Sequence, residues 1–447
     1  MVILLNFRSQ DWRNINQVIK KALVSRLIVF LIQILSAFLI PVHDADAFKI
    51  SHFLEPRNGD QINWFAKNIL LGYTRWDSQY FLSIAKDGYY SERLIVFFPL
   101  YPLLTRYLEK IIFNRVKDGF ASLVISSILL NHTLFLISSI LLFKLSMRIF
   151  HNSPVNSRIQ KALEAVQYFC FNPASIFFSA CYSESLFMTL TLAALLSLEA
   201  ARPFCSAMFF GLACLTRSNG LFAVIFLVYF HFESIFKRTT AKRNQISILF
   251  SRAIFSQVFK LSLQLFVMLF PFVLHQIISR KIICSEKSAQ NSEFCSSILV
   301  LPYAFIQKKY WNVGFLNYYQ FKQLPNFALA LPVLTTSALI VFNFFKAHKK
   351  KLIHLEWLNL MKRSQKTSRS WANERCLPYL LHLSILLTIS LLFVHVQVST
   401  RLIFSSTPII YWAIASSESK VKKYFRLYSH VYMVVGTCLY SRFYPWT

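Results

Sequence analysis

Long apolar runs separated by short basic blocks dominate the pattern along the chain. Ten runs are long enough, or nearly so, to cross a bilayer as helices, since a span needs roughly 20 apolar residues. They cover residues 22–42, 121–143, 163–180, 185–201, 204–232, 253–278, 327–345, 377–394, 402–415 and 427–440. Several runs are short, and residues 204–232 can form one span or two. The pattern therefore predicts an all-α polytopic membrane protein with about 8–11 transmembrane helices.

The run at 204–232 decides the topology. Basic residues gather in blocks at 8–26, 144–161, 237–252, 346–369 and 420–426, and such blocks remain in the cytosol. All five lie on one side only if the run at 204–232 enters the membrane and returns, turning at "TRSNG" (216–220). Ser-Asn-Gly favours a turn, and Arg217 alone in mid-bilayer would be costly. A single tilted helix is the alternative, and it would invert everything downstream.

With the basic blocks in the cytosol, we expect one integral membrane domain over residues 1–447 with a cytosolic N-terminus. The first helix lacks a small-residue cleavage site and is expected to be retained. A large loop at 43–120, with amphipathic helices, and a second segment at 279–326 then share the opposite face. The loop at 346–376 is basic and cytosolic. Nine of the 19 acidic residues lie in the loop at 43–120, so polar chemistry is concentrated there.

Composition excludes an ordinary soluble protein. Of the 447 residues, 55% are hydrophobic and only 15% are charged, and the mean hydropathy is +0.46. A net charge of +29 would suggest nucleic acid as the partner of a soluble domain. Here the positive charge lies between apolar runs and predicts orientation and contact with anionic membrane lipids instead. The eight cysteines form no CxxC pair or Cys/His cluster, so we expect no metal and no cofactor.

The stretch "RWDSQYFLSIAKDG" (75–88) carries an isolated acid before a helix. Apolar spacing predicts a helix from residue 78 to 87, closed by Gly88, with Asp77 at the N-cap position. In the simpler interpretation, Asp77 caps an interfacial helix and Trp76 lies in the aromatic belt. In the functional interpretation, Asp77 is a general base for an acceptor hydroxyl. The stretch itself leaves both open.

Other motifs are equally ambiguous one by one. "CYSES" places Glu184 in the first turn of a span with Ser183 as a possible cap. Arg217 of "TRSNG" lies at a turn, from which its side chain can snorkel. Arg401 of "HVQVSTR" lies at a membrane boundary, where it either snorkels or holds the phosphate of a lipid-linked substrate. Taken together they are more informative, because the predicted topology brings one set to the same face: Asp77, Glu184, Arg217, Asn219, Lys322, Asn326 and Arg401.

Six stretches resemble one family in the same order and over nearly the whole chain. They are "RWDSQYFLSIAKDGY", "FFPLYPLL", "CYSESLF", "TRSNGL", "NYYQFKQLPNFALALP" and "HVQVSTRLIFSSTPIIYW". Together they resemble the PIG-V family of mannosyltransferases of the glycosylphosphatidylinositol (GPI) anchor, GPI mannosyltransferase 2, in glycosyltransferase family 76. The resemblance implies a GT-C glycosyltransferase of the endoplasmic reticulum membrane with a luminal active site.

The resemblance also implies the reaction and its residues. Mannose would pass from dolichyl-phosphate-mannose, with inversion, in α1,6 linkage to the first mannose of the glucosaminyl-acylphosphatidylinositol precursor. Asp77 would be the catalytic base. Candidates for binding the donor phosphate or sugars are Arg401, Arg217, Lys322, Glu184, Asn219, Trp76 and Gln79. Candidates for a lipid groove are Phe98, Pro99, Tyr101 and Pro102, and Cys284 and Cys295 are candidates for a disulfide in an oxidising compartment.

Two other functions remain open. The nearest is a luminal enzyme that uses a dolichyl-phosphate sugar on another acceptor, such as a lipid-linked oligosaccharide. A polytopic transporter or scramblase is the other, although the acidic residues cluster in a loop rather than within helices. A small accessory membrane subunit is a candidate partner, beside the membrane lipids, dolichyl-phosphate-mannose and the GPI precursor.

Overall fold

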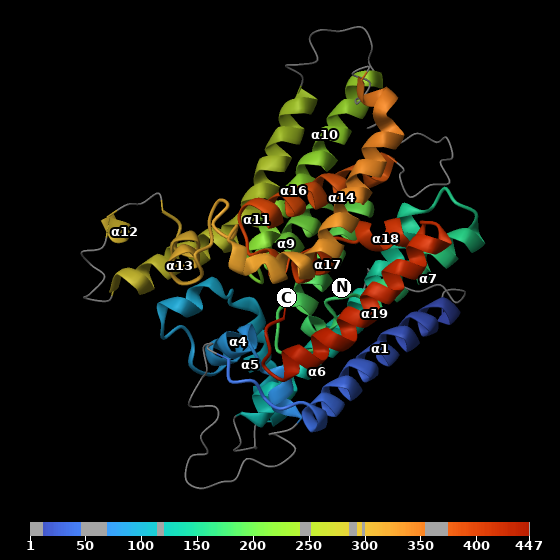
Figure 1. Ribbon diagram of the computed structural model, residues 1–447. Helices are drawn as coiled ribbons and strands as arrows, with labels where there is room; N and C mark the ends of the chain where they lie inside the picture. Colours follow the sequence, from blue (N-terminus) through green and yellow to red (C-terminus); the bar gives the residue numbers. More distant parts are fainter. Residues whose placement is uncertain are drawn as a thin grey trace.

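The computed structural model describes residues 12–45, 69–113, 120–241, 252–285, 293–296, 300–353 and 374–446. Every regular element within these ranges is a helix (Figure 1). Parts of the predicted segments 43–120, 279–326 and 346–376 lie outside the described residues.

Within the described residues, five helical segments are long and apolar enough to cross a membrane: Trp12–Leu39, Ala121–Ile149, Ser218–Phe236, Ile254–Ser285 and Phe321–His348. They correspond to α1 (Trp12–Leu39), α6 (Ala121–Ile149), η6 (Ser218–Ala223) with α10 (Val224–Ala241), α11 (Arg252–Ser285), and η8 (Phe321–Gln323) with α14 (Leu324–Ile353). Two shorter apolar helices are α9 (Pro203–Cys214) and α16 (Leu377–Leu392). The predicted polytopic, all-α membrane protein is confirmed, whereas the GT-C architecture stays a prediction.

The remaining elements pack around these helices or lie at their ends. The α-helices are α4 (Asp77–Asp87), α5 (Leu100–Phe113), α7 (Val155–Cys170), α8 (Glu184–Glu199), α12 (Glu293–Ser296), α13 (Pro302–Trp311), α17 (Ser399–Ser406), α18 (Ile409–Ala415) and α19 (Ser419–Ser441). The short 3-10 helices are η3 (Leu70–Tyr73), η4 (Glu92–Val96), η5 (Ser175–Phe178), η9 (Glu374–Cys376) and η10 (Val396–Val398).

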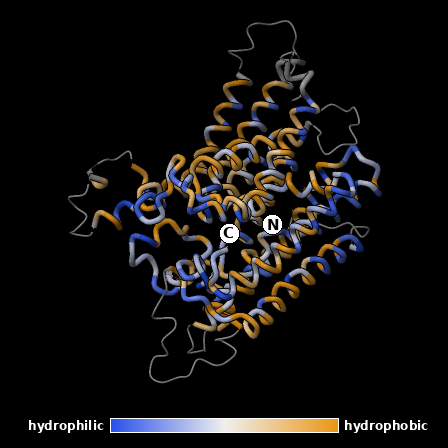
Figure 2. The backbone as a smooth tube through the Cα atoms, viewed as in Figure 1, coloured by the Kyte–Doolittle hydropathy of each residue, from blue (hydrophilic) through white to orange (hydrophobic). Residues whose placement is uncertain are grey.

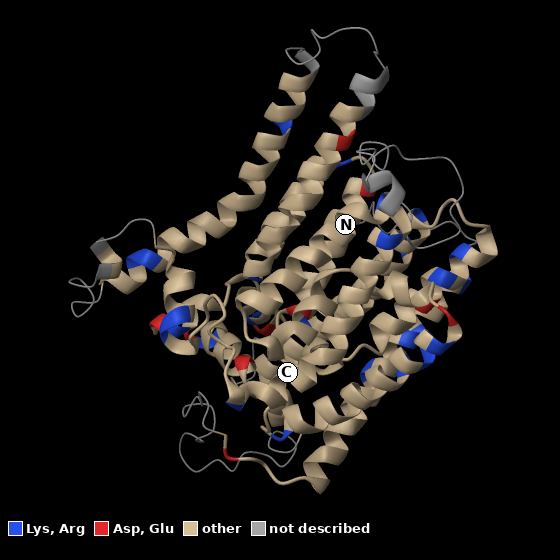
Figure 3. Cartoon of the chain, turned by 45° about the horizontal axis from the view of Figure 1, so that its top comes forward, with Lys and Arg blue, Asp and Glu red and all other residues tan. Residues whose placement is uncertain are grey.

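Helices α1, α7 and α19 run in the same direction. Near the start of α19, Lys422 lies 2.6 Å from Glu164, which is past the middle of α7. At the other end, the hydroxyls of Ser36 in α1 and Ser441 in α19 are 2.6 Å apart. Many lysines and arginines gather at the starting end, seen as the blue group along α1, α7 and α19 in Figure 3. This clustering agrees with the predicted cytosolic side.

The run at 204–232 forms two helices, α9 and α10, separated at "TRSNG". The side chains of Glu184, at the start of α8, and Arg217, just after α9, form an ion pair. Helix α9 therefore returns to the end where α8 begins, and α10 leaves from there. A Cβ at Gly220 would lie 2.8 Å from the backbone nitrogen of Cys214, which only glycine avoids at this close approach. The predicted reversal is confirmed.

Many aromatic side chains are buried in the interior, and hydrophobic residues follow one another along most of the helices (Figure 2). Trp412, Phe135 and Phe169 are fully buried, and the Trp412 indole donates to the Ser146 hydroxyl at 2.7 Å. On α11, by contrast, a row of phenylalanines including Phe255 is exposed. An outward apolar face of this kind suits contact with lipid tails.

Two predicted spans are interrupted. The run at 163–180 ends as a helix at Cys170 and continues into η5. The Asn172 amide donates to the Phe169 carbonyl at 2.7 Å, and Asn172 Oδ1 accepts from the Ala174 N–H, while Pro173 has no N–H to continue a helix. The run at 402–415 is likewise two short helices, α17 and α18, joined at Thr407 and Pro408.

Arg26 was expected to belong to the cytosolic basic block at 8–26, and this expectation is wrong. Arg26 lies in the middle of α1 and its side chain is buried. Its guanidinium lies 3.9 Å from the Phe135 ring centroid. It donates to the carbonyls of Ser175 at 2.8 Å and Cys170 at 3.2 Å, and to the Ser179 hydroxyl at 2.8 Å. Because backbone carbonyls freed by a helix break need partners inside a membrane protein, Arg26 is paired with the break after α7.

The predicted cysteine pair is bonded in the structure. A disulfide joins Cys284 near the end of α11 to Cys295 in α12, with their Cα atoms 5.9 Å apart. Helix α13 follows and packs on η4, where Glu92 lies 2.6 Å from the ammonium of Lys309. The two segments predicted to share one face therefore meet there.

Candidate active site

Asp77 lies at the first residue of α4 rather than at its N-cap. Trp76 occupies the N-cap position with φ 54° and ψ −128° and makes no side-chain capping bond. The N–H of Asp77 donates to the Tyr182 hydroxyl at 2.9 Å. The predicted helix over 78–87 and its closure by Gly88 are confirmed. The predicted capping role of Asp77 is wrong, because its carboxylate points elsewhere.

The Asp77 carboxylate contacts Arg401. Arg401 Nη1 donates to Asp77 Oδ2 at 2.7 Å, although 324 positions separate the two residues. The side chains of Asp77 and Arg401 are 28% and 16% exposed, respectively, so the pair is mostly buried. Hydrogen bonds between charged groups in such partly buried places are strong. Helix α17, which carries Arg401, thus fixes the acid at the start of α4.

Glu184 links the two arginines of this face. Its Oε1 accepts from Arg217 Nη1 and lies 3.9 Å from Arg401 Nη1. Glu184 is fully buried in the first turn of α8, where the positive end of the helix dipole favours a carboxylate. Its other oxygen, Oε2, has no hydrogen-bond partner in the described part of the chain. Ser183 makes no side-chain cap of α8, so that prediction is wrong.

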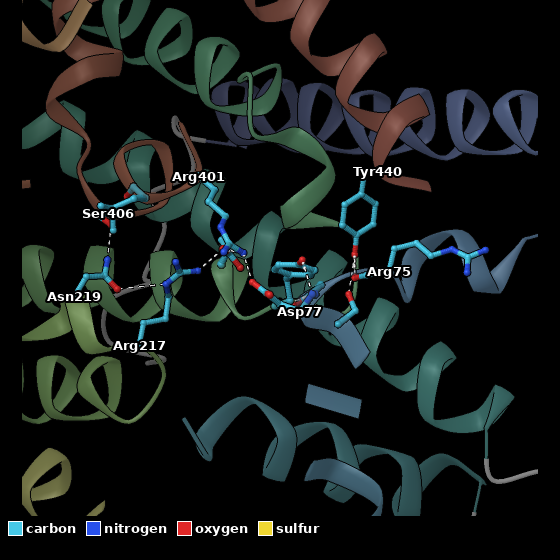
Figure 4. A network of polar contacts seen from close by, with 12 residues as sticks. Arg75, Asp77, Arg217, Asn219, Arg401, Ser406 and Tyr440 are labelled. Atoms are coloured by element: carbon cyan, nitrogen blue, oxygen red, sulfur yellow. Dashed lines mark hydrogen bonds and ion pairs between the residues drawn. The ribbon is translucent and has the colours of Figure 1, made fainter. Parts of the chain in front are cut away.

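Asn219 extends the network to the α17 helix. Its Oδ1 accepts from Arg217 Nε at 3.3 Å, and its Nδ2 donates to the Ser406 hydroxyl at 2.8 Å. Figure 4 shows the resulting chain of contacts, which runs from Ser406 through Asn219 to Arg217, and by way of Glu184 to Arg401 and Asp77. Four of the sequence-predicted residues therefore meet Asp77 in one continuous network.

The network is balanced in charge, with two guanidinium groups and two carboxylates. Burial alone would lower the pKa of Arg401, but the nearby groups of Asp77, Tyr182 and Glu184 outweigh it and raise the pKa above its usual value. The Arg401 guanidinium also lies 5.4 Å and 5.5 Å from the ring centroids of Phe177 and Tyr182. Arg401 thus stays charged and is held in place.

Some predicted residues lie apart from this network. Lys322 is exposed in η8, and no contact joins it to Asp77 or Glu184 within the described ranges. Asn326 instead donates to the Tyr318 hydroxyl at 2.8 Å. Trp76 packs edge-on against Phe443, with centroids 5.1 Å apart, and Gln79 is buried in α4. Their predicted roles in sugar or phosphate binding stay predictions.

The candidates for a lipid groove belong mostly to the packed interior. Phe98, Tyr101 and Pro102 are buried, and Pro99 is partly exposed. The Tyr101 hydroxyl bonds to Ser127 and accepts from the Asn131 amide at 3.0 Å. A lipid-facing wall would need exposed side chains, so their burial gives the groove prediction no support.

Sequence reasoning missed Tyr182 as a partner of Asp77. The signal was present, since Tyr182 stands two positions before Glu184 in "CYSES". Its role became visible only when the structure placed its hydroxyl 2.9 Å from the Asp77 nitrogen. Tyr303 is a second such residue, because its hydroxyl accepts from Ser218 at 2.8 Å and brings α13 against the "TRSNG" turn.

Fold and site together define a multi-pass membrane protein with a carboxylate–arginine network where several helices begin or end. The family model described as "Mannosyltransferase (PIG-V)" matches residues 15–447. The chain belongs to this family and is therefore a glycosyltransferase that transfers mannose.

Known relatives are similar over most of their length. The chain is 33% identical to GPI mannosyltransferase 2 of Drosophila melanogaster over 465 aligned residues, covering 96% of this chain and 99% of the relative. It is 31% identical to GPI alpha-1,6-mannosyltransferase 2 of Homo sapiens, covering 89% and 82%. For GPI mannosyltransferase 2 of Schizosaccharomyces pombe the identity is 26%, covering 85% and 74%. No solved structure matches the chain.

Proposed function

We propose that this protein transfers the second mannose of the GPI anchor precursor, in α1,6 linkage, from dolichyl-phosphate-mannose. Two findings support this reaction. The chain is similar along nearly its whole length to proteins named for this transfer. The observation that carries the mechanism is the network of Asp77, Arg401, Glu184 and Arg217.

Asp77 acts as the base in this proposal. The acceptor is the 6-hydroxyl of the first mannose on glucosaminyl-acylphosphatidylinositol, and its proton must be removed as its oxygen attacks the donor sugar. Arg401 contacts Oδ2 of Asp77, which leaves Oδ1 to accept the hydroxyl proton. The hydrogen bond from the Asp77 N–H to the Tyr182 hydroxyl fixes the start of α4, which carries the carboxylate.

Arg401 and Arg217 stabilise the leaving group. A glycosidase needs a second carboxyl group because it must protonate an alkoxide, whereas a lipid phosphate leaves as a stable anion. The departing lipid phosphate needs cations and N–H donors instead, and the guanidinium groups of Arg401 and Arg217 provide both. Glu184 holds the arginines close to Asp77 before the donor arrives. One base with two arginines is then a sufficient set.

Donor binding also frees the base. The incoming phosphate and the Asp77 carboxylate compete for Arg401, which lies between Asp77 and Glu184. When the phosphate takes its place on Arg401, the ion pair with Asp77 loosens and the carboxylate is free to accept the proton of the acceptor hydroxyl. A β-linked donor and an α-linked product require inversion, so no covalent sugar intermediate forms.

The proposed location is the endoplasmic reticulum membrane, with the Asp77 network on the luminal side. The common basic end of α1, α7 and α19 supports a cytosolic N-terminus. The disulfide of Cys284 and Cys295 supports an oxidising compartment on the opposite side. A small accessory membrane subunit and the membrane lipids complete the proposed partners.

The test is mannose transfer by the purified full-length chain in lipid nanodiscs. Dolichyl-phosphate-mannose is supplied with the one-mannose GPI precursor or with a lipid-linked oligosaccharide, and the product linkage is determined. We expect α1,6-linked mannose on the GPI precursor. Transfer only to the oligosaccharide would overturn the acceptor, and transfer to neither by a folded protein with its accessory subunit would overturn the function.

A further inference from the structure

Arg75 and Arg442 form a second pair of positive charges beside the Asp77 network. Arg75 is only 7% exposed. Its Nε donates to the Ser441 carbonyl at 3.4 Å, and its guanidinium lies 5.2 Å from the Phe443 ring centroid. Arg442 stands between these two contact residues at the end of α19. Two arginines from opposite ends of the sequence therefore lie at one place.

Neither arginine is neutralised by an acidic residue of the described chain, since no ion pair joins them to one. Arg401 and Arg217, by contrast, each contact a carboxylate. The Nε of Arg442 is buried and has no hydrogen-bond partner within the same described ranges. Burial and the charge of Arg442 lower the pKa of Arg75 to about 10. An anion bound here would compensate both the burial of the Arg75 charge and its repulsion from Arg442.

Hydrogen bonds hold the backbone of both arginines in place. The Tyr440 hydroxyl donates to the Arg75 carbonyl at 2.8 Å and lies 2.8 Å from the Ser78 hydroxyl. The Arg442 carbonyl accepts from the His43 N–H at 2.9 Å. Three segments distant in sequence thus fix the two arginines.

The turn at Trp76 separates the two sites. Its positive φ of 54° is uncommon for a residue other than glycine. In Figure 4 the Arg75 side chain points away from Asp77. A group bound by Arg75 is therefore close to the Asp77 network but is not at the reacting atoms.

We propose that Arg75 and Arg442 bind the phosphodiester of the lipid acceptor. This inference rests on the proposed function, in which both substrates carry a lipid phosphodiester. The donor phosphate must lie at the reacting carbon, next to Asp77 and Arg401. The acceptor phosphodiester is separated from its reacting hydroxyl by sugars and inositol, and so needs a second anion site. Guanidinium groups suit it because they offer paired N–H donors to phosphate oxygens.

A binding measurement tests this site without mannose transfer. Short-chain phosphatidylinositol is titrated into the purified full-length protein, and bound lipid is counted by native mass spectrometry. We expect R75Q/R442Q to bind it at least about tenfold more weakly than the wild type. Arg426→Gln is the matched control, since Arg426 is exposed at the other end of α19. If R75Q/R442Q does not fold, R442Q replaces it. Equal binding by wild type and variant would overturn the site.

Kinetics then identify which phosphodiester is bound. The ratio of kcat/KM for the GPI precursor to that for a phosphate-free mannosyl-glucosaminyl-inositol is expected to fall about tenfold in R75Q/R442Q. An unchanged ratio with a raised KM for dolichyl-phosphate-mannose would instead assign the arginines to the donor and overturn the proposal. Failure of the wild type to transfer mannose would refute the proposed function, whereas the binding result would stand separately.

Discussion

Asp77 and Glu184 share Arg401, but the two carboxylates differ in their other contacts and in their burial. Asp77 lies 2.7 Å from Arg401, and Glu184 lies 3.9 Å from it while also holding Arg217. Glu184 is fully buried, whereas Asp77 is 28% exposed. The buried carboxylate therefore positions the arginines, and the more exposed one can meet a substrate.

Removal of the Glu184 charge is expected to destabilise the protein. In Glu184→Gln, two nearby arginines lose a buried counter-charge, which costs about 3 kcal/mol of the free energy of unfolding. Thermal and denaturant unfolding of the purified protein measure the loss. Glu199→Gln at the other end of α8 is the matched control.

A second substitution separates stability from activity. Arg217→Gln added to Glu184→Gln removes the unpaired charge, so most of the lost stability should return while mannose transfer stays low. Stability that fails to recover in the double variant would contradict the pairing of these two residues.

At the scale of elements, breaks in helices carry the site. The interruption after α7 leads into η5 and then to Tyr182 and Glu184. The "TRSNG" turn presents Arg217, and the short helix α17 presents Arg401. Irregular backbone is tolerated at membrane depth only where protein buries it and satisfies its polar groups. Arg26 does this for the break after α7.

Arg26 is therefore expected to support the site from a distance. Arg26→Met leaves the carbonyls of Cys170 and Ser175 without a donor and should lower the free energy of unfolding by about 3 kcal/mol. Arg13→Met, exposed on the same helix, should change it little. Denaturant titration measures the free energy of unfolding of both variants. An Arg26→Met protein as stable as the wild type would refute the role of Arg26 in supporting the helix break.

Local patterns predicted local elements well. Helix α4, its closure at Gly88 and the reversal at "TRSNG" follow from apolar spacing, glycine and the cost of an isolated arginine. The contacts of Asp77 did not follow, because an N-cap preference depends on neighbours whereas its ion pair depends on a residue 324 positions away. The burial of Arg26 does not follow from local pattern for the same reason, since its acceptors are carbonyls at the break after α7, which only the folded structure brings next to it.

At the scale of the whole molecule, the basic blocks and the Asp77 network should lie on opposite sides of the membrane. In a Cys205→Ser background, which removes the exposed free cysteine of the described chain, Lys423→Cys and Asp87→Cys place thiols at exposed positions. We expect an impermeant maleimide to label Lys423→Cys in intact microsomes, and Asp87→Cys only after the membrane is opened. The reverse pattern would invert the topology.

The proposed mechanism depends most on Asp77 as the base. The most direct measurement is rescue of GPI-anchored surface protein in cells that lack this mannosyltransferase, comparing Asp77→Asn with Asp87→Asn at matched expression. Asp87 is a suitable control because it is exposed at the far end of α4. Loss of a general base costs about 10² to 10⁴ in rate. Asp77→Asn should therefore accumulate the one-mannose precursor while Asp87→Asn rescues, and full rescue by Asp77→Asn would contradict the mechanism.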